Sequence, residues 1–127
     1  MVLGIGVDLC DIPRFLKIYE KHPESFVSRL FISEEMDFWK QYGEASKENL
    51  AVMFAGKEAL IKAVGEKLKT LSYGYHDFQV LFQPQQQILL RYSLSLQKQI
   101  FGEQTPKIVA SMSKTVDYAI VTVIIEG

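Results

Sequence analysis

The spacing of hydrophobic positions differs between the two halves of the chain. After a first alternating strand at 2–8, apolar residues recur every three or four positions, which predicts helices at 12–21, 33–39 and 47–68. Asp11 is the expected N-cap of the first of these helices. Beyond residue 70, short apolar runs bounded by turn residues predict strands at 76–83, 88–94, 107–113 and 117–125, with a short helix at 93–101. Helices crowd the first half and strands the second, so the pattern favours an α+β fold over a βαβ series.

The first strand has two unlike faces. Leu3, Ile5 and Val7 share one face, while Gly4, Gly6 and Asp8 share the other. A dinucleotide-binding fingerprint is excluded, because Leu9 stands where that motif needs glycine. The glycines instead thin one face, so that another backbone or a ligand can approach Asp8. Asp8 itself is either a turn residue or a carboxylate placed to reach a metal.

The long helix places two adjacent charges in an apolar stretch. Lys57 and Glu58 lie within MFAGKEALIKAVG, residues 53–65. On a helical wheel Glu58 is about 40° from the direction of Phe54 and Ile61, the stripe expected to face the core. An ion pair with Lys62, four residues on, would stabilise Glu58 by only about 0.2–0.5 kcal/mol. That is too little to offset the burial of a carboxylate, so Glu58 is either at the edge of the core or part of a site.

Composition indicates one ordinary globular domain over residues 1–127. Apolar residues make up 48% and charged residues 23% of the chain, and the formal net charge of −1 excludes a broad nucleic-acid-binding surface. A single cysteine, Cys10, cannot form an internal disulfide, and no basic segment precedes Asp8 as in a signal peptide. The longest apolar run is too short to cross a membrane. We therefore expect a cytoplasmic protein without a membrane segment.

Two pairs of polar residues were considered as candidate sites. Ser111 and Ser113 lie in SMSK, which matches a Ser-x-x-Lys motif but lacks its companion motifs and falls on an expected strand, so coincidence is favoured. Their hydroxyls either donate to a phosphate or face solvent. His22 and His76 are isolated and give no support for zinc.

The first helix has a basic face. Its cations are spaced i, i+3 and i+7, opposite the apolar stripe, with Ile18 among them; they are Arg14, Lys17 and Lys21. A basic face with one exposed hydrophobic residue suits docking of an acidic protein. The alternative is a solvated face that happens to include an isoleucine.

Taken together, these residues resemble a known family. The segments GIGVDLCDIPRF, SFVSRLFISEEM, FAGKEALIKAVG and SMSKTVDYAIVTV occur in the order seen in bacterial holo-acyl-carrier-protein synthases, which are small 4′-phosphopantetheinyl transferases. The match covers nearly the whole chain and is weakest across 66–105. Its most specific part is the aromatic-x-x-Lys-Glu-x-x-x-Lys pattern of Phe54, Lys57, Glu58 and Lys62, joined by Asp8 at the end of the first strand.

The resemblance implies a fold, a reaction and a set of roles. The fold is a single domain with an antiparallel sheet packed against a long helix, and the family is a trimer with sites between subunits. The reaction moves 4′-phosphopantetheine from coenzyme A to a serine of acyl carrier protein and leaves adenosine 3′,5′-bisphosphate. Asp8 and Glu58 would hold Mg²⁺, with Lys62 along the phosphates. Either Glu58 or a metal-bound water would take the serine proton.

The resemblance also implies the binding surfaces. Coenzyme A would contact residues of the long helix and of the SMSK segment at 111–114: Lys57, Lys62, Gly65, Ser111, Ser113 and Lys114. The acidic carrier would meet Arg14, Ile18 and Lys21 on the first helix.

The sequence departs from the family at four places. Met53 replaces an arginine before the aromatic residue, Gly56 replaces an alanine, Lys114 replaces a histidine, and Gly65-Glu66-Lys67 replaces Gly-Thr-Gly. Loss of an arginine removes a bidentate phosphate ligand. These departures leave two hypotheses, which are an enzyme with altered substrate binding and a non-catalytic homologue that binds acyl carrier protein or coenzyme A as a scaffold or regulator.

Overall fold

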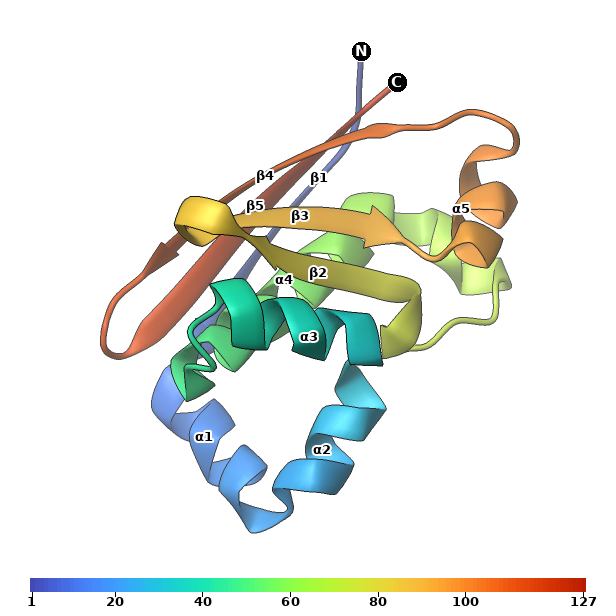
Figure 1. Ribbon diagram of the computed structural model, residues 1–127. Coiled ribbons are helices and arrows are strands. Elements are labelled where there is room, and N and C mark those ends of the chain that lie inside the picture. The colour runs from blue at the N-terminus through green and yellow to red at the C-terminus, as the bar shows by residue number, and fades with distance from the viewer.

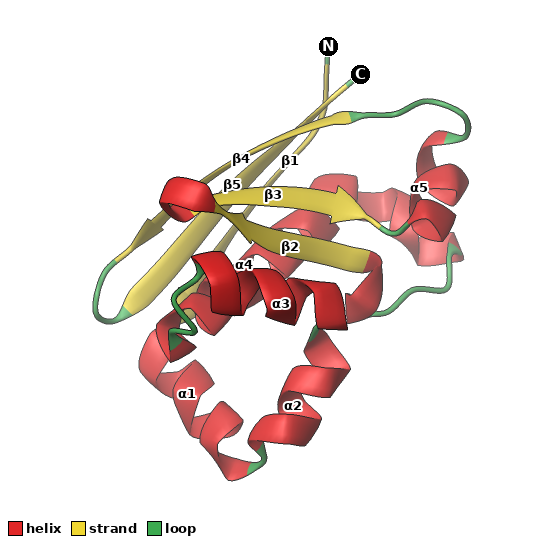
Figure 2. Cartoon of the chain, viewed as in Figure 1, coloured by secondary structure: helices red, strands yellow, loops and turns green.

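A computed structural model describes residues 1–127, the whole chain, as five strands, five α-helices and three short 3₁₀ segments (Figures 1 and 2). In chain order they are β1 (Val2–Asp11), α1 (Ile12–Lys21), α2 (Pro23–Leu30), α3 (Ser33–Tyr42), α4 (Lys47–Val64), η1 (Gly65–Thr70), η2 (Tyr75–Asp77), β2 (Phe78–Gln83), η3 (Pro84–Gln86), β3 (Gln87–Tyr92), α5 (Leu94–Phe101), β4 (Lys107–Lys114) and β5 (Tyr118–Glu126). The expected α+β class is confirmed.

The larger sheet has the strand order β1-β5-β4 and is antiparallel throughout. Helix α4 lies across one face of this sheet, very close to β1. A Cβ atom built on Gly4 would lie 2.1 Å from the carbonyl oxygen of Ala63, and one on Gly6 would lie 2.0 Å from that of Ala59. The two glycines are thus needed because the backbone of α4 occupies the space where side chains would stand.

A second sheet, the β2–β3 hairpin, packs on another side of α4. A Cβ on Gly56 would come within 2.9 Å of the Val80 side chain, so this glycine allows β2 to approach the helix. With a sheet on two sides, α4 is buried along most of its circumference, and eleven of its eighteen residues are buried. Figure 1 shows α1, α2 and α3 arranged around one end of this core, with both chain termini at the other.

Four sequence-based expectations differ from the structure. Helix α2 (Pro23–Leu30) was not expected, and α3 extends to Tyr42. Helix α4 ends at Val64, because Gly65 adopts a φ of 67°, and a 3₁₀ segment follows. The stripe of Phe54 and Ile61 was expected to face the core, yet both residues are only partly buried and the opposite side of α4 is fully buried.

Candidate functional site

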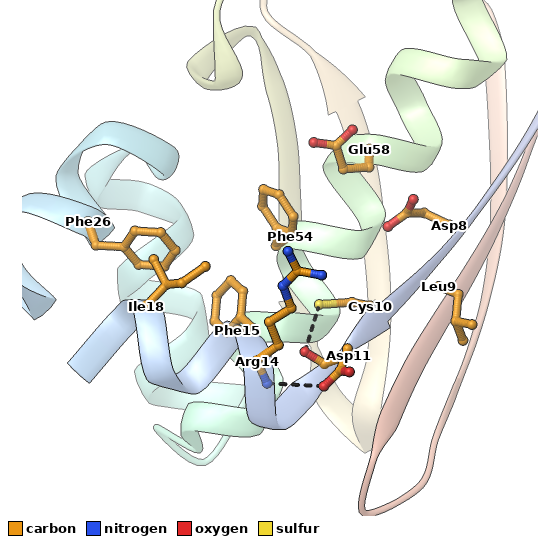
Figure 3. Close-up of a pocket in the computed structure, with 10 residues that line it drawn as sticks. All are labelled: Asp8, Leu9, Cys10, Asp11, Arg14, Phe15, Ile18, Phe26, Phe54 and Glu58. Carbon is orange, nitrogen blue, oxygen red and sulfur yellow. Dashed lines mark hydrogen bonds between the residues drawn. The ribbon is translucent and has the colours of Figure 1, made fainter. Parts of the chain in front are cut away.

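A pocket of about 400 Å³ lies where the end of β1 meets α1 and α4 (Figure 3). Its walls combine aromatic and aliphatic side chains with three carboxylates and one guanidinium; the ten lining residues are Asp8, Leu9, Cys10, Asp11, Arg14, Phe15, Ile18, Phe26, Phe54 and Glu58. Asp8 and Glu58, fifty residues apart in sequence, therefore face the same cavity. In Figure 3 both carboxylates extend toward the space above Phe54 and Arg14.

Asp8 lies in the C-terminal half of β1, on the same face as Gly4 and Gly6, which packs against α4. Its Oδ1 accepts a hydrogen bond of 2.9 Å from Lys62 Nζ, which also donates to the carbonyl oxygen of Val7 at 3.0 Å. The Lys62 side chain is 53% exposed and that of Asp8 is 16% exposed. The pair is thus at the surface, where a lysine can change partners at little cost in free energy.

Glu58 does not pair with Lys62 as the helical spacing had suggested. Its Oε1 accepts a hydrogen bond of 2.8 Å from the hydroxyl of Tyr75 in η2. Burial, together with the hydrogen bond to Glu58 and the charge of that carboxylate, raises the pKa of Tyr75 to about 12. Tyr75 is therefore a protonated donor at neutral pH. The Glu58 carboxylate is held at the edge of the core, facing the pocket.

The two adjacent charges of α4 have different environments. Lys57 is fully buried, and its Nζ donates to Glu35 Oε1 at 2.8 Å, to the carbonyl of Tyr75 at 3.1 Å, and to that of Phe78. Burial lowers the pKa of Lys57, and Glu35 opposes that shift. All three N–H donors of the ammonium are used within the chain. This placement does not fit the expected role of Lys57 in binding the coenzyme.

The basic face of α1 borders the pocket. Asp11 caps this helix, since its Oδ1 accepts from the backbone N–H of Arg14 at 3.0 Å, as its position in the sequence predicted. Arg14 and Ile18 line the pocket itself, and Ile18 is 48% exposed. Lys21, one turn further, is exposed outside it. Two of the three residues expected to meet a carrier protein accordingly line the same pocket as the two carboxylates.

The remaining expected coenzyme ligands lie outside this pocket. Ser111 and Ser113 are exposed on the side of β4 that faces away from α4. Lys114 Nζ donates to Asn49 Oδ1 at 2.9 Å, which ties the end of β4 to the first turn of α4. Gly65 ends α4 about 10 Å along the helix axis from Glu58. Within one chain, none of these residues contacts the cavity that holds Asp8.

Two departures from the family pattern fall in the interior. Met53 is fully buried in the hydrophobic core, and Gly56 contacts β2 as described above. Neither Met53 nor Gly56 lines the pocket. The lysine at 67 is exposed on η1, with its Nζ 5.7 Å from the ring centroid of Phe101.

Asp8 and Glu58 fit the oxygen ligands that Mg²⁺ prefers. Carboxylates are hard donors, and Mg²⁺ commonly takes only one or two from the protein while water and substrate phosphates fill the rest. The structure has no cluster of three or more His, Cys, Asp or Glu side chains placed to hold a metal. The two carboxylates therefore suit a cation that is shared with a phosphate ligand, and do not form a closed structural metal site.

Sequence reasoning missed two residues of the site region. Tyr75 lies in a stretch without hydrophobic periodicity, so nothing in its local pattern links it to Glu58. Glu35 falls within the helix expected at 33–39 and was given no role, yet it is fully buried and also accepts from the backbone N–H groups of Ile32 and Val80. Cys10, on the pocket wall, has its thiol pKa raised to about 11 by burial and by Asp8 and Asp11.

Comparison with known proteins decides the family. The model of the 4′-phosphopantetheinyl transferase superfamily matches residues 4–123. The chain belongs to this superfamily of enzymes. A holo-[acyl-carrier-protein] synthase from Halalkalibacterium halodurans is 32% identical over 127 residues, covering 99% of this chain and 97% of the relative. One from Zymomonas mobilis is 31% identical over 132 residues, covering 100% and 98%. The resemblance read from the sequence is confirmed, and the chain is a phosphopantetheinyl transferase.

Solved structures of the superfamily share the fold. The holo-[acyl-carrier-protein] synthase of Neisseria meningitidis superposes with a TM-score of 0.80 at 27% identity, over 100% of both chains. That of Bacillus anthracis, solved in complex with CoA (3′,5′-ADP), gives a TM-score of 0.72 at 23% identity, covering 99% of this chain and 97% of that one. No helix of the chain combines the length and apolar character needed to span a bilayer.

Proposed function

We propose that the chain transfers 4′-phosphopantetheine from coenzyme A to a serine hydroxyl of an apo-acyl carrier protein in a Mg²⁺-dependent reaction. The serine oxygen forms a bond to the phosphorus that carries the pantetheine arm. The bond from that phosphorus to the bridging oxygen breaks, adenosine 3′,5′-bisphosphate leaves with the electron pair, and the serine proton is released. The single observation that carries this proposal is the convergence of Asp8 and Glu58 in one pocket beside Lys62.

The charges of the pocket support the choice of ligand. A pyrophosphate brought beside Asp8 and Glu58 would be repelled, and a divalent cation held by these two carboxylates would offset that repulsion. When bound there, Mg²⁺ would neutralise charge on the pyrophosphate and on the leaving group. Lys62 supplies a further cation at the same rim, and its exposed Nζ can exchange Asp8 for a phosphate oxygen. The bound CoA of the Bacillus anthracis relative agrees with this ligand class.

The carrier protein would dock on α1. Arg14 and Lys21 offer positive charge to an acidic partner, and Ile18 offers an exposed apolar contact. Because Arg14 and Ile18 also line the pocket, a carrier held there would present its serine to the coenzyme. The reaction would take place in the cytoplasm, in keeping with a single free cysteine.

We also propose that the protein works as a homotrimer. The outer sheet face, meaning the side of β1, β5 and β4 turned away from α4, exposes large apolar side chains, among them Ile5 at 62%, Leu9 at 59%, Val7 at 48%, Val109 at 41% and Ile120 at 38%. Such a contiguous patch is typical of a subunit interface. Copies that pack through it would bring Ser111 and Ser113 of one chain toward a neighbour, where they could complete a coenzyme site.

The transfer is tested by incubating the protein with apo carrier, coenzyme A and Mg²⁺ and measuring the mass of the carrier. We expect a gain of one phosphopantetheine arm, which depends on Mg²⁺ and falls at least about 100-fold in rate in Glu58→Gln. Asp8→Asn should behave in the same way. A carrier that stays unmodified but co-purifies with the chain would instead support the non-catalytic scaffold, which the departures at Met53 and Lys114 motivate.

The trimer has its own test. Sedimentation velocity of the wild-type protein should give about three times the mass of one chain, and Val7→Glu should shift the protein toward monomers because it buries a charge in the interface. A wild-type protein that sediments as a monomer at micromolar concentration would remove the trimer and the coenzyme site shared between subunits, while the mass of the carrier would still decide separately whether transfer occurs.

A further inference from the structure

Tyr75 links the pocket carboxylate to the interior of the protein. Its hydroxyl donates to Glu58 Oε1 at 2.8 Å, and its ring lies against Phe54, with centroids 5.8 Å apart. Two further hollows border Tyr75 and Gly74, and one of them also reaches Glu58. The ring of Tyr75 thus stands beside Glu58 without lining the pocket that Glu58 shares with Asp8.

The backbone of this segment is held firmly. The buried ammonium of Lys57 donates to the carbonyl of Tyr75 at 3.1 Å. Gly74 and Asp77 bind each other through two hydrogen bonds, of 2.9 and 3.1 Å, and the His76 ring is 2.8 Å from the carbonyl oxygen of Ser28. A side chain carried by a backbone with this many partners has few alternative positions.

We propose that Tyr75 is a positioning residue for Glu58, and this inference rests on the proposed function. A glutamate side chain has three rotatable bonds, and Glu58 is only partly buried, so packing alone does not select one rotamer. The Tyr75 hydroxyl fixes Oε1, while Oε2 makes no hydrogen bond within the chain and stays available to a ligand. Lys57 thereby contributes to the site indirectly, because it holds the backbone from which Tyr75 reaches Glu58.

The positioning role predicts which kinetic constant changes. Tyr75 contacts Glu58 and does not line the pocket where α1 would receive the carrier. Loss of its hydroxyl should therefore misplace the carboxylate that acts on the reacting phosphate, which lowers kcat. The KM for the carrier should remain close to that of the wild type. Cation binding by the free protein should weaken as well, because Glu58 must then be ordered when the ion binds.

The test compares Tyr75→Phe with Tyr73→Phe. Tyr73 lies two residues away, its ring packs on Phe78 with centroids 5.6 Å apart, and its hydroxyl makes no hydrogen bond within the chain. We expect Tyr75→Phe to lower kcat roughly 5- to 20-fold with the carrier KM within about twofold. Binding of Mn²⁺ alone, followed by electron paramagnetic resonance without substrates, should weaken about fivefold. Tyr73→Phe should match the wild type in both measurements.

Each other outcome overturns the inference. Wild-type values of kcat and Mn²⁺ affinity in Tyr75→Phe would show that the hydroxyl does not act on Glu58. Equal losses in both phenylalanine variants would indicate a general loosening of the segment, as would a rise in carrier KM alone. Thermal unfolding of both variants, expected within about 2 °C of the wild type, checks that they fold. If the wild type transfers nothing, the proposed function fails, and the Mn²⁺ measurement still decides on Tyr75.

Discussion

Helix α4 contributes a lysine to each of two ion pairs, and the two pairs differ in burial and in the number of partners that the ammonium has. Lys57 and Glu35 are fully buried, and the ammonium has two further carbonyl partners. Lys62 and Asp8 are near the surface, with the lysine 53% exposed. The interior pair has no free donor, while the surface pair can open toward a ligand. The same residue type on one helix therefore forms a closed interior contact at one position and an exposed contact at the other, where we propose a role in the reaction.

The difference follows from what surrounds each lysine. Around Lys57, α3, η2 and β2 meet α4, and they supply one carboxylate and two carbonyl groups from three directions. The Lys62 ammonium has hydrogen-bond partners from β1 alone, and just over half of the side-chain surface is exposed. A buried charge is stable only when its partners are complete, so the interior pair must stay closed. The surface pair carries no such requirement, which suits a site that has to accept a charged substrate.

The largest effect is expected when the interior pair is broken. Lys57→Met would leave the Glu35 carboxylate buried without a cation and two carbonyls without a donor. We expect the free energy of unfolding to fall by about 3–5 kcal/mol in urea titrations. Lys62→Met, the same substitution five positions along α4, should change it by less than about 1 kcal/mol.

A second variant separates the charge from the loss of packing. Glu35→Gln removes the negative charge and keeps one side-chain oxygen, which can accept from the N–H group of Ile32 or of Val80 but not from both. Added to Lys57→Met, it should restore part of the lost stability, because no isolated charge then remains. A Lys57→Met protein as stable as Lys62→Met would show that the interior pair is not what distinguishes the two lysines.

The second prediction concerns activity, for which we expect Lys62 to matter although it matters little for stability. Lys62→Gln should leave stability nearly unchanged and lower kcat/KM for phosphopantetheine transfer roughly 10- to 100-fold, because it removes a charged donor from the phosphate-binding rim. Lys62→Arg keeps the charge and should retain more activity than Lys62→Gln. If Lys62→Gln transfers at the wild-type rate, the surface pair has no part in the reaction, and the exposure of Lys62 is without functional meaning.

The sequence predicted the fold class and most elements because these depend on local spacing. The cap at Asp11, the long helix and the strands of the second half were all visible as periodicity and turn residues. The core-facing side of α4 was predicted wrongly. A helix covered by sheets on two sides has apolar residues nearly all around, so its hydrophobic pattern no longer indicates one direction.

The site was only partly predictable for a related reason. The residues that would act on substrate stand in a recognisable order along the chain, and the pocket brings Asp8 and Glu58 together. The partners that support them are set by long-range contacts. Tyr75 and Glu35 lie 17 and 22 residues from Glu58 and Lys57, respectively, in segments whose own sequences give no sign of the contact. Predicting them requires knowing which elements pack together.

The smallest effect is expected at a buried polar group that, unlike the Lys57 ammonium, has no hydrogen-bond partner. Tyr92 is 2% exposed, and its hydroxyl is buried without a hydrogen-bond partner. Tyr92→Phe removes that hydroxyl and keeps the ring contacts with Phe78 and Phe101. At pH 7 we expect stability to be unchanged or higher by up to about 1 kcal/mol, because no bond is lost and an unsatisfied group is removed.

The pH dependence of the same variant gives an independent check. Burial raises the pKa of Tyr92 above its ordinary value of 10. The folded protein therefore keeps this proton at pH values where the unfolded chain has lost it, so the wild type should lose stability as the pH rises above 10. Tyr92→Phe lacks this group, and its urea midpoint should fall less steeply across that range. Parallel pH curves for the two proteins would mean that the hydroxyl is accessible to water in the folded protein. A clear loss of stability in Tyr92→Phe at pH 7 would mean that the hydroxyl is hydrogen-bonded in solution, and either result would show that Tyr92 is not an unsatisfied interior group.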